Sequence, residues 1–139
     1  MDDYFEENSE NYNDLPVLKK ANDILKVTFA LSDIIDKEKD ELMLADQMLS
    51  NALTIPSKIA GAEGGNLYSI RFDNATLIKL SARELLAQAS LVEKEGLCDK
   101  EYVQLLRDEI EEFRILFLNW VSSFDKDDDL EDEWNIRNL

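Results

Sequence analysis

The sequence of 139 residues contains no histidine and a single cysteine, Cys98. Without histidine, Ser-His and Cys-His catalysis is excluded, as is the Glu-x-x-His motif of di-iron helical bundles. A single thiol forms neither an internal disulfide nor a cysteine-rich zinc site, and the neighbouring Asp99 does not favour a thiolate. No apolar run approaches the roughly 20 residues of a membrane span. We therefore expect no catalytic residue, no bound metal or cofactor, and no membrane contact.

The net charge of −16 is concentrated at the two ends of the chain. Residues 1–14 contain six acids and no base, and residues 125–139 contain seven acids and two bases. We expect two solvated acidic tails around one domain at residues 15–124. These tails would repel a phosphate backbone, which disfavours nucleic-acid binding. The first residues also lack the basic and apolar regions of a signal peptide, so we expect a cytoplasmic protein.

Apolar residues recur every three or four positions, which is the period of amphipathic helices, and no segment alternates like a strand. Helices are predicted at residues 15–36, 37–60, 66–95 and 99–124. Asp14 and Asp99 are the expected N-caps, and Gly96 followed by Leu97 is the expected C-cap of the third helix. Because the linkers are short, neighbouring helices should be antiparallel. The predicted fold is all-α, an up-down-up-down four-helix bundle.

Each predicted helix has one apolar face. The first two faces comprise Val17, Ala21, Ile24, Thr28, Leu31 and Ile35, then Leu44, Met48, Ala52, Ile55 and Ile59. The third comprises Leu67, Ile70, Leu77, Ile78, Leu85 and Val92. The fourth is an unbroken heptad seam of Val103, Leu106, Ile110, Phe113, Phe117, Trp120 and Phe124.

The fourth helix has more apolar surface than a four-helix core needs. In "ILFLNWV", residues 115–121, only Asn119 is polar. A helix that is apolar on all sides requires a second partner, and another copy of the chain is the simplest one. We predict an oligomer interface at Ile115, Leu118 and Val121. The alternative is that the C-terminal tail folds back and Trp134 covers this patch.

Pro56 lies inside the second predicted helix, and three of the four glycines follow it in "GAEGG". Because the helical period continues through Ile59, the proline predicts a kink in this helix rather than its end. The glycines lack the GK[ST] of a phosphate-binding loop and the preceding strand of a dinucleotide fold. They are better interpreted as a helix C-terminus and a tight turn.

Polar residues also recur at helical spacing and form a polar seam. Its members are Gln47, Asn51, Thr54 and Lys58 on the second helix, and Ser81, Glu84 and Gln88 on the third. The seam is either an exposed face or a hydrogen-bonded strip inside the bundle or along an oligomer channel. An ion pair between Lys58 and Glu84 would be its natural centre.

The abundant carboxylates allow an alternative function, a metal-dependent nucleotide pyrophosphohydrolase. Magnesium would need carboxylate pairs on two helices facing one cleft, and Glu63, Glu84, Glu109 and Glu112 are the candidates. Glu109 and Glu112 flank the heptad seam, however, which favours a solvated face. The acidic run "DKDDDLEDEW" lacks the glycine and the bidentate glutamate of a calcium loop, so a tail is favoured there too.

Four motifs resemble one known family. They are "DLPVLKKA"; "QMLSNALTIPSKIAGAEGG"; Ser81, Glu84, Leu85 and Gln88; and "EGLCDKEYVQLLRDEIEEFRILFLNWVSSF". Together they span residues 14–124 and resemble the four-helix-bundle proteins encoded by 23S ribosomal RNA intervening sequences. That family includes the accessory protein of diversity-generating retroelements. Within the second motif, the matching positions are Gln47, Thr54, Ile55, Pro56, Ile59 and Ala60, followed by Ala62, Glu63 and Gly64.

The resemblance implies a ring of five subunits with a central channel and no known catalysis. Some relatives are accessory proteins that bind nucleic acid or a polymerase. Here Leu49, Ser50 and Lys58 stand where the family has arginines and an asparagine, so the charge disfavours a nucleic-acid partner. The sequence therefore predicts a non-catalytic, self-assembling scaffold or adaptor, with a homopentamer favoured.

Overall fold

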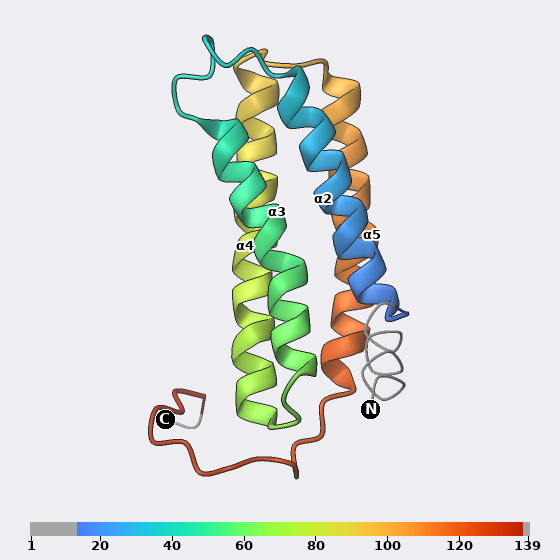
Figure 1. Cartoon of the computed structure of the whole chain (residues 1–139), viewed down its shortest axis with the longest axis vertical. Helices are drawn as coiled ribbons and strands as arrows, with labels where there is room; N and C mark the ends of the chain where they lie inside the picture. Colours follow the sequence, from blue (N-terminus) through green and yellow to red (C-terminus); the bar gives the residue numbers. More distant parts are fainter. Residues whose placement is uncertain (1–13, 138–139) are drawn as a thin grey trace, which may run out of the picture.

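Helices form where the apolar stripes predict them. The computed structural model describes residues 14–137, which fold into four α-helices and no strand. Each helix packs against the next along the chain, and the last closes against the first (Figure 1). The predicted up-down-up-down four-helix bundle is confirmed. The helices are α2 (Pro16–Ile34), α3 (Leu44–Glu63), α4 (Tyr68–Lys94) and α5 (Lys100–Ser122).

The core confirms three of the four predicted apolar faces. Every residue named for the first, second and fourth predicted helices is buried. The aromatic side chains of α5 follow one another toward its C-terminus, and Trp120 packs edge-on against Phe124 with ring centroids 4.8 Å apart. This end of the bundle is therefore filled by rings, whereas aliphatic side chains fill most of the rest.

The predicted face of α4 is partly wrong. Ile70 and Leu77 are exposed, whereas the polar Ser81 and Gln88 are buried, as Ile78 is. Leu77 precedes Ile78 and is therefore rotated by about 100° around the helix, away from the core. Small residues of α4, such as Ala75, occupy the core instead and allow a close approach of neighbouring helices.

One predicted helix start and one predicted N-cap are also wrong. α3 begins at Leu44 rather than at residue 37, because the charged run before it has no apolar face. The buried carboxylate of Asp40 accepts hydrogen bonds from the backbone N–H groups of Leu44 (2.8 Å) and Ala45 (2.9 Å). Those bonds satisfy orphan donors of the first turn and fix its position.

At the start of α2, Leu15 is the N-cap residue in place of Asp14, and no side chain caps this end. The residue before a proline is biased toward extended backbone, and Leu15 has φ −64° and ψ 123°. Asp99 is the N-cap of α5 as predicted, but its side chain makes no capping hydrogen bond.

The predicted end of α4 is confirmed. Gly96 has a left-handed φ of +66°, which glycine adopts at no steric cost. The backbone N–H of Leu97 donates to the carbonyl of Val92 (3.0 Å), and that of Gly96 donates to Glu93 (3.1 Å). This pair of bonds is the Schellman motif, and the buried Leu97 supplies its apolar contact.

Pro56 lies inside α3, which continues through it to Glu63. Ile55 before the proline and Ile59 after it are both fully buried, so the helical period is kept across it. The glycines after Ala60 lie at the end of this helix and in the short turn to α4, as predicted.

Residues 125–137 contact the bundle instead of lying free of it. The segment runs from the end of α5 beneath the bundle to the start of α4 (Figure 1). The backbone N–H of Tyr68 donates to the carbonyl of Asp128 (2.7 Å), and the N–H and hydroxyl of Ser69 donate to Asp129. The guanidinium of Arg137 lies 4.7 Å from the ring centroid of Phe72. The predicted tail at residues 1–14 lies outside the described residues, except for Asp14.

Candidate functional site

The patch predicted from the apolar part of α5 is open to solvent. Ile115 is 59% exposed and Leu118 is 54% exposed, while Val121 is half-buried and packs against the core. Trp134 is 88% exposed and therefore does not cover the patch. The alternative in which Trp134 folds over Ile115 and Leu118 is wrong, because the C-terminal segment turns toward α4 instead.

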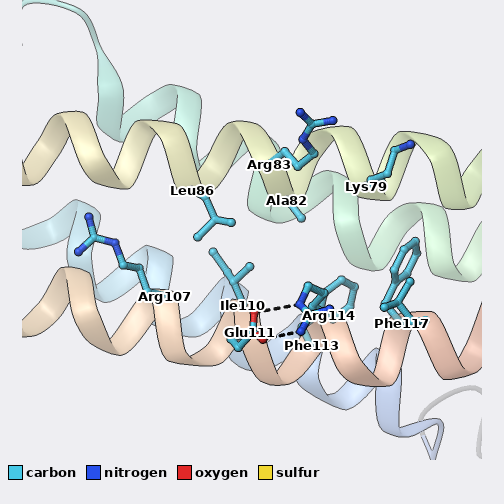
Figure 2. Close-up of a pocket in the computed structure, with 11 residues that line it drawn as sticks. Lys79, Ala82, Arg83, Leu86, Arg107, Ile110, Glu111, Phe113, Arg114 and Phe117 are labelled. Carbon is cyan, nitrogen blue, oxygen red and sulfur yellow. Dashed lines mark hydrogen bonds and ion pairs between the residues drawn. The ribbon is translucent and has the colours of Figure 1, made fainter.

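Leu118 also lines a groove between α4 and α5 with a volume of about 270 Å³. The apolar part of the groove comes from both helices: Ala82, Leu86, Ile110, Phe113 and Phe117. Figure 2 shows Leu86 of α4 and Ile110 of α5 pointing toward one another between the two helices. We call this feature the α4–α5 groove.

The edges of the α4–α5 groove carry positive charge. Four cations line it, Lys79 and Arg83 from α4 and Arg107 and Arg114 from α5, against one carboxylate, Glu111. Arg114 donates two hydrogen bonds to Glu111 (2.6 and 3.0 Å), and Arg107 donates to Glu93 (2.7 Å). The bonds from Arg114 lower the pKa of the Glu111 carboxyl. This concentration of cations stands out on a chain of charge −16.

No pattern in the sequence predicted this groove. Its cations are distributed over two helices, and each helix separately looks like an ordinary charged face. Lys79 and Arg83 are four positions apart and therefore lie on one face of their helix. Only the pairing of the two helices in the bundle adds Arg107 and Arg114.

The predicted polar seam forms in part, at the contact between α3 and α4. Asn51 donates to the side-chain oxygen of Gln88 (3.0 Å), and Gln88 donates to Gln47 (3.4 Å). Because Gln88 is buried, these amides satisfy one another where water has little access.

The other members of the polar seam do not join this network. Thr54 donates to the carbonyl of Ser50 within its own helix, and Ser81 is buried on α4. The ion pair predicted between Lys58 and Glu84 is wrong, since none of the ion pairs among the described residues joins them. Glu84 is exposed to solvent instead.

The four candidate metal ligands are not brought together. Glu109 and Glu112 both accept hydrogen bonds from the ammonium of Lys20 on α2, at 3.0 and 2.6 Å. These two bonds raise the pKa of Lys20. Within residues 14–137, no group of three or more carboxylate or thiol side chains has the spacing of a metal site.

Glu63 occupies a different site at the lower end of the bundle. One of its carboxylate oxygens accepts hydrogen bonds from Arg71 (2.8 Å) and from the indole N–H of Trp120 (2.8 Å). The guanidinium of Arg71 also lies 4.2 Å from the ring centroid of Phe124. This cluster joins α3, α4 and α5, so the carboxylate of Glu63 already has a structural role in holding the three helices together.

Cys98 is the only thiol, and its surroundings oppose activation. Burial raises the pKa of the Cys98 thiol, and the negative charges of Asp99 and Glu93 raise it further. The thiolate is the reactive form of cysteine, so this position does not have the chemistry of a nucleophile.

Comparisons with known proteins give no match, either to family models or among the curated proteins. Among the helices of the described residues, none is long and apolar enough to cross a membrane.

Proposed function

We propose that the chain is a non-catalytic scaffold or adaptor that assembles with further copies of itself. The observation that carries this proposal is the exposed pair Ile115 and Leu118 on a helix whose opposite face fills the core. Large apolar side chains at an open helix surface, next to an apolar groove, are typical of a contact with another protein. A second copy is always present at the concentration of the first.

A ring of five copies in the cytoplasm is the favoured form of this assembly. This number comes from the resemblance to the intervening-sequence family, whose motifs span residues 14–124. The bundle has the four consecutive helices that the resemblance implies.

The experiment is a measurement of mass in solution by size exclusion with light scattering. The intact chain should have a mass several times 16.0 kDa, with five copies favoured. Leu118→Glu places a charge in the contact and should yield monomers whose helix content, by circular dichroism, is unchanged. A monomeric wild-type chain at micromolar concentration would contradict the proposal.

Leu105→Glu is the matched control. Leu105 lies on the same helix and is 48% exposed, but it lines a different groove, between α2 and α5. It should leave the assembly intact. Dissociation by both variants would show that the contact is not specific to the patch around Leu118.

Two other functions compete with this proposal, and the described structure favours neither. A magnesium-dependent nucleotide hydrolase would need Glu109 and Glu112 to leave Lys20 and to face two further carboxylates. An accessory protein for nucleic acid would need a row of cations available to phosphate. Lys20, Arg71, Arg107, Arg114 and Arg137 bind carboxylates of the chain itself, so Lys79 and Arg83 are, among the described residues, the unpaired cations of the α4–α5 groove. Release of pyrophosphate from nucleotides, or salt-dependent retention on RNA, would reveal them.

A further inference from the structure

The α4–α5 groove combines two properties that call for one kind of occupant. Its interior is apolar, with Leu86 and Ile110 facing one another, and its edges carry four cations against one acid (Figure 2). An occupant that matches both would alternate apolar or aromatic side chains with carboxylates. An uncharged apolar segment would not supply carboxylates to the cations. A purely acidic segment would not displace water from the apolar interior of the groove.

The cations of α4 remain available for such an occupant. Arg107 and Arg114 of α5 already bind Glu93 and Glu111. Lys79 and Arg83 are exposed, and neither forms an ion pair with any carboxylate of residues 14–137. Ligand carboxylates would therefore be recognised on the α4 edge.

The chain itself contains a segment of this composition. Residues 1–13, "MDDYFEENSENYN", hold five acids and no base, with Tyr4, Phe5 and Tyr12 among them. The acidic pairs flank the central aromatic pair, which is the alternation that the groove requires. The C-terminal acidic segment is not equivalent, because its contacts with Ser69 and Phe72 hold it at α4's first turn.

Residues 1–13 join the bundle at a point from which they can reach the α4–α5 groove. Residue 14 precedes α2, whose first turn lies at the same end of the bundle as the last turn of α5 (Figure 1). Thirteen residues span up to about 43 Å when extended, at about 3.3 Å each. The stretch of α5 from Arg107 to Leu118 is about 17 Å long at 1.5 Å per residue. The segment can therefore pass around α5 and still follow the groove.

We propose that residues 1–13 bind in the α4–α5 groove of their own chain, with aromatic side chains against Leu86 and Ile110 and carboxylates at Lys79 and Arg83. The covalent link favours the chain's own groove, because a short tether gives an effective concentration on the order of millimolar. The inference does not depend on self-assembly, since the groove and the segment belong to one chain.

The test places a paramagnetic label in the segment of the full-length chain. Cys98→Ser removes the native thiol, and Ser9→Cys provides a unique attachment site for a nitroxide. Amide signals of residues 79–86 and 107–114 should lose intensity in the NMR spectrum and recover when the nitroxide is reduced. Broadening confined to other parts of the bundle, or absent everywhere, would overturn the proposal.

Charge reversal at the groove supplies the specificity control. Lys79→Glu with Arg83→Glu should abolish the broadening at the groove. Lys26→Glu with Lys100→Glu changes the net charge by the same amount at exposed positions outside the groove. This double variant should keep the broadening of the groove signals. Equal loss in both double variants would mean that the segment responds to net charge alone, which contradicts a built site. Thermal melts confirm that each variant is folded.

A mixed sample distinguishes the chain's own groove from that of another copy. Isotope-labelled chain without nitroxide is combined with nitroxide-labelled chain at natural isotope abundance. The groove signals of the isotope-labelled chain should keep their intensity. Their loss in the mixture would overturn binding within one chain and assign the segment to a neighbouring copy. Ile115 belongs to the same exposed patch but does not line the groove, so Ile115→Glu supplies the monomeric background in which failure of self-assembly and failure of this proposal give different results.

Discussion

Individual carboxylates fix the ends of the helices. Asp40 closes the first turn of α3 through two backbone N–H groups, although its side chain lies four residues before the helix. Glu63 joins Arg71 of α4 and Trp120 of α5 from the last residue of α3. Asp40 lies in a charged run and Glu63 lies among small residues, and neither sequence context indicates the contacts that its carboxylate makes.

Glu63 supports the first prediction at this scale. Glu63→Ala removes the acceptor of two donors, and the cost should be about 1–3 kcal/mol of the free energy of unfolding, the usual penalty for donors left unpaired in a partly buried site. Urea denaturation followed by tryptophan fluorescence measures it, and the buried Trp120 should account for most of the change because Trp134 is already exposed. Glu63→Gln keeps an acceptor and should cost less than Glu63→Ala.

Glu111→Ala is the control for this prediction. Its carboxylate also binds an arginine, Arg114, but both side chains are exposed. Surface ion pairs contribute little, so stability should hardly change. An equal loss in Glu111→Ala and Glu63→Ala would contradict a special role for the lower cluster.

At the scale of the helix, the sequence was a reliable guide wherever large apolar residues keep an unbroken helical step. The seam of α5 was predicted in full, because its seven large residues keep the heptad step throughout. α4 was harder to predict, because its core positions include Ala75 and the polar Ser81 and Gln88, whereas Ile70 and Leu77 are exposed. Periodicity measures the spacing of large apolar side chains and misses small or hydrogen-bonded residues that pack inside.

The candidate site followed the same rule. Ile115 and Leu118 were predicted from one helix as part of an oligomer interface, and both are exposed in the single chain. The α4–α5 groove was missed because it depends on which helices become neighbours. The network of Gln47, Asn51 and Gln88 was predicted as a seam, but its boundaries required knowledge of which side chains meet.

Pro56 allows a prediction for α3. In an exposed helix interior, replacing proline with alanine would stabilise by up to about 3 kcal/mol. Here we expect little gain or a loss, because a bend at Pro56 would determine how Ile55 and Ile59 meet the other helices. Self-assembly should weaken in the same variant. Thermal melts and sizing of Pro56→Ala measure both, and a variant that is clearly more stable and fully assembled would contradict the prediction.

The contact between the C-terminal segment and α4 should depend on pH. Hydrogen bonds from the hydroxyl and the backbone N–H of Ser69 lower the pKa of the Asp129 carboxyl. A lowered pKa in the folded state means that this contribution is complete above the ordinary value of an aspartate, about 3.9. It is lost as the pH falls through the lower pKa of the folded form.

NMR titration of the Ser69 amide signal measures this loss. Asp129→Asn should remove the transition, while Asp127→Asn, at an exposed acid of the same segment, should preserve it. A Ser69 signal that stays constant from neutral pH to about pH 2, well below the ordinary aspartate pKa, would show that the carboxylate is not what holds the segment.

For the whole molecule, charge opposes assembly while apolar surface favours it. Every copy carries −16, so subunits repel one another at low ionic strength. Screening shortens the range of this repulsion from about 30 Å at 0.01 M salt to about 10 Å at 0.1 M. We expect assembly to occur at lower protein concentration as salt is raised, which light scattering over a dilution series measures.

The segment of residues 1–13 should respond in the opposite direction. In the proposed contact its acids meet cations of the α4–α5 groove, so the same increase in salt should weaken that contact. Salt therefore separates the two proposed interactions in one sample. Dissociation of the assembly by salt would show that ion pairs, rather than Leu118 and its neighbours, hold the subunits together.

The path of residues 125–137 has a mechanical consequence. Tension on the C-terminus reaches the contacts of Arg137 with Phe72 and of Asp129 with Ser69 before it reaches α5. These contacts are loaded one after another, so they open in sequence rather than together. Ser69 and Phe72 belong to α4, so the first turn of this helix bears the load before the end of α5 does. Once the contacts open, the 13 residues of the segment can extend to at most about 43 Å, at about 3.3 Å each, before they pull straight on the last turn of α5.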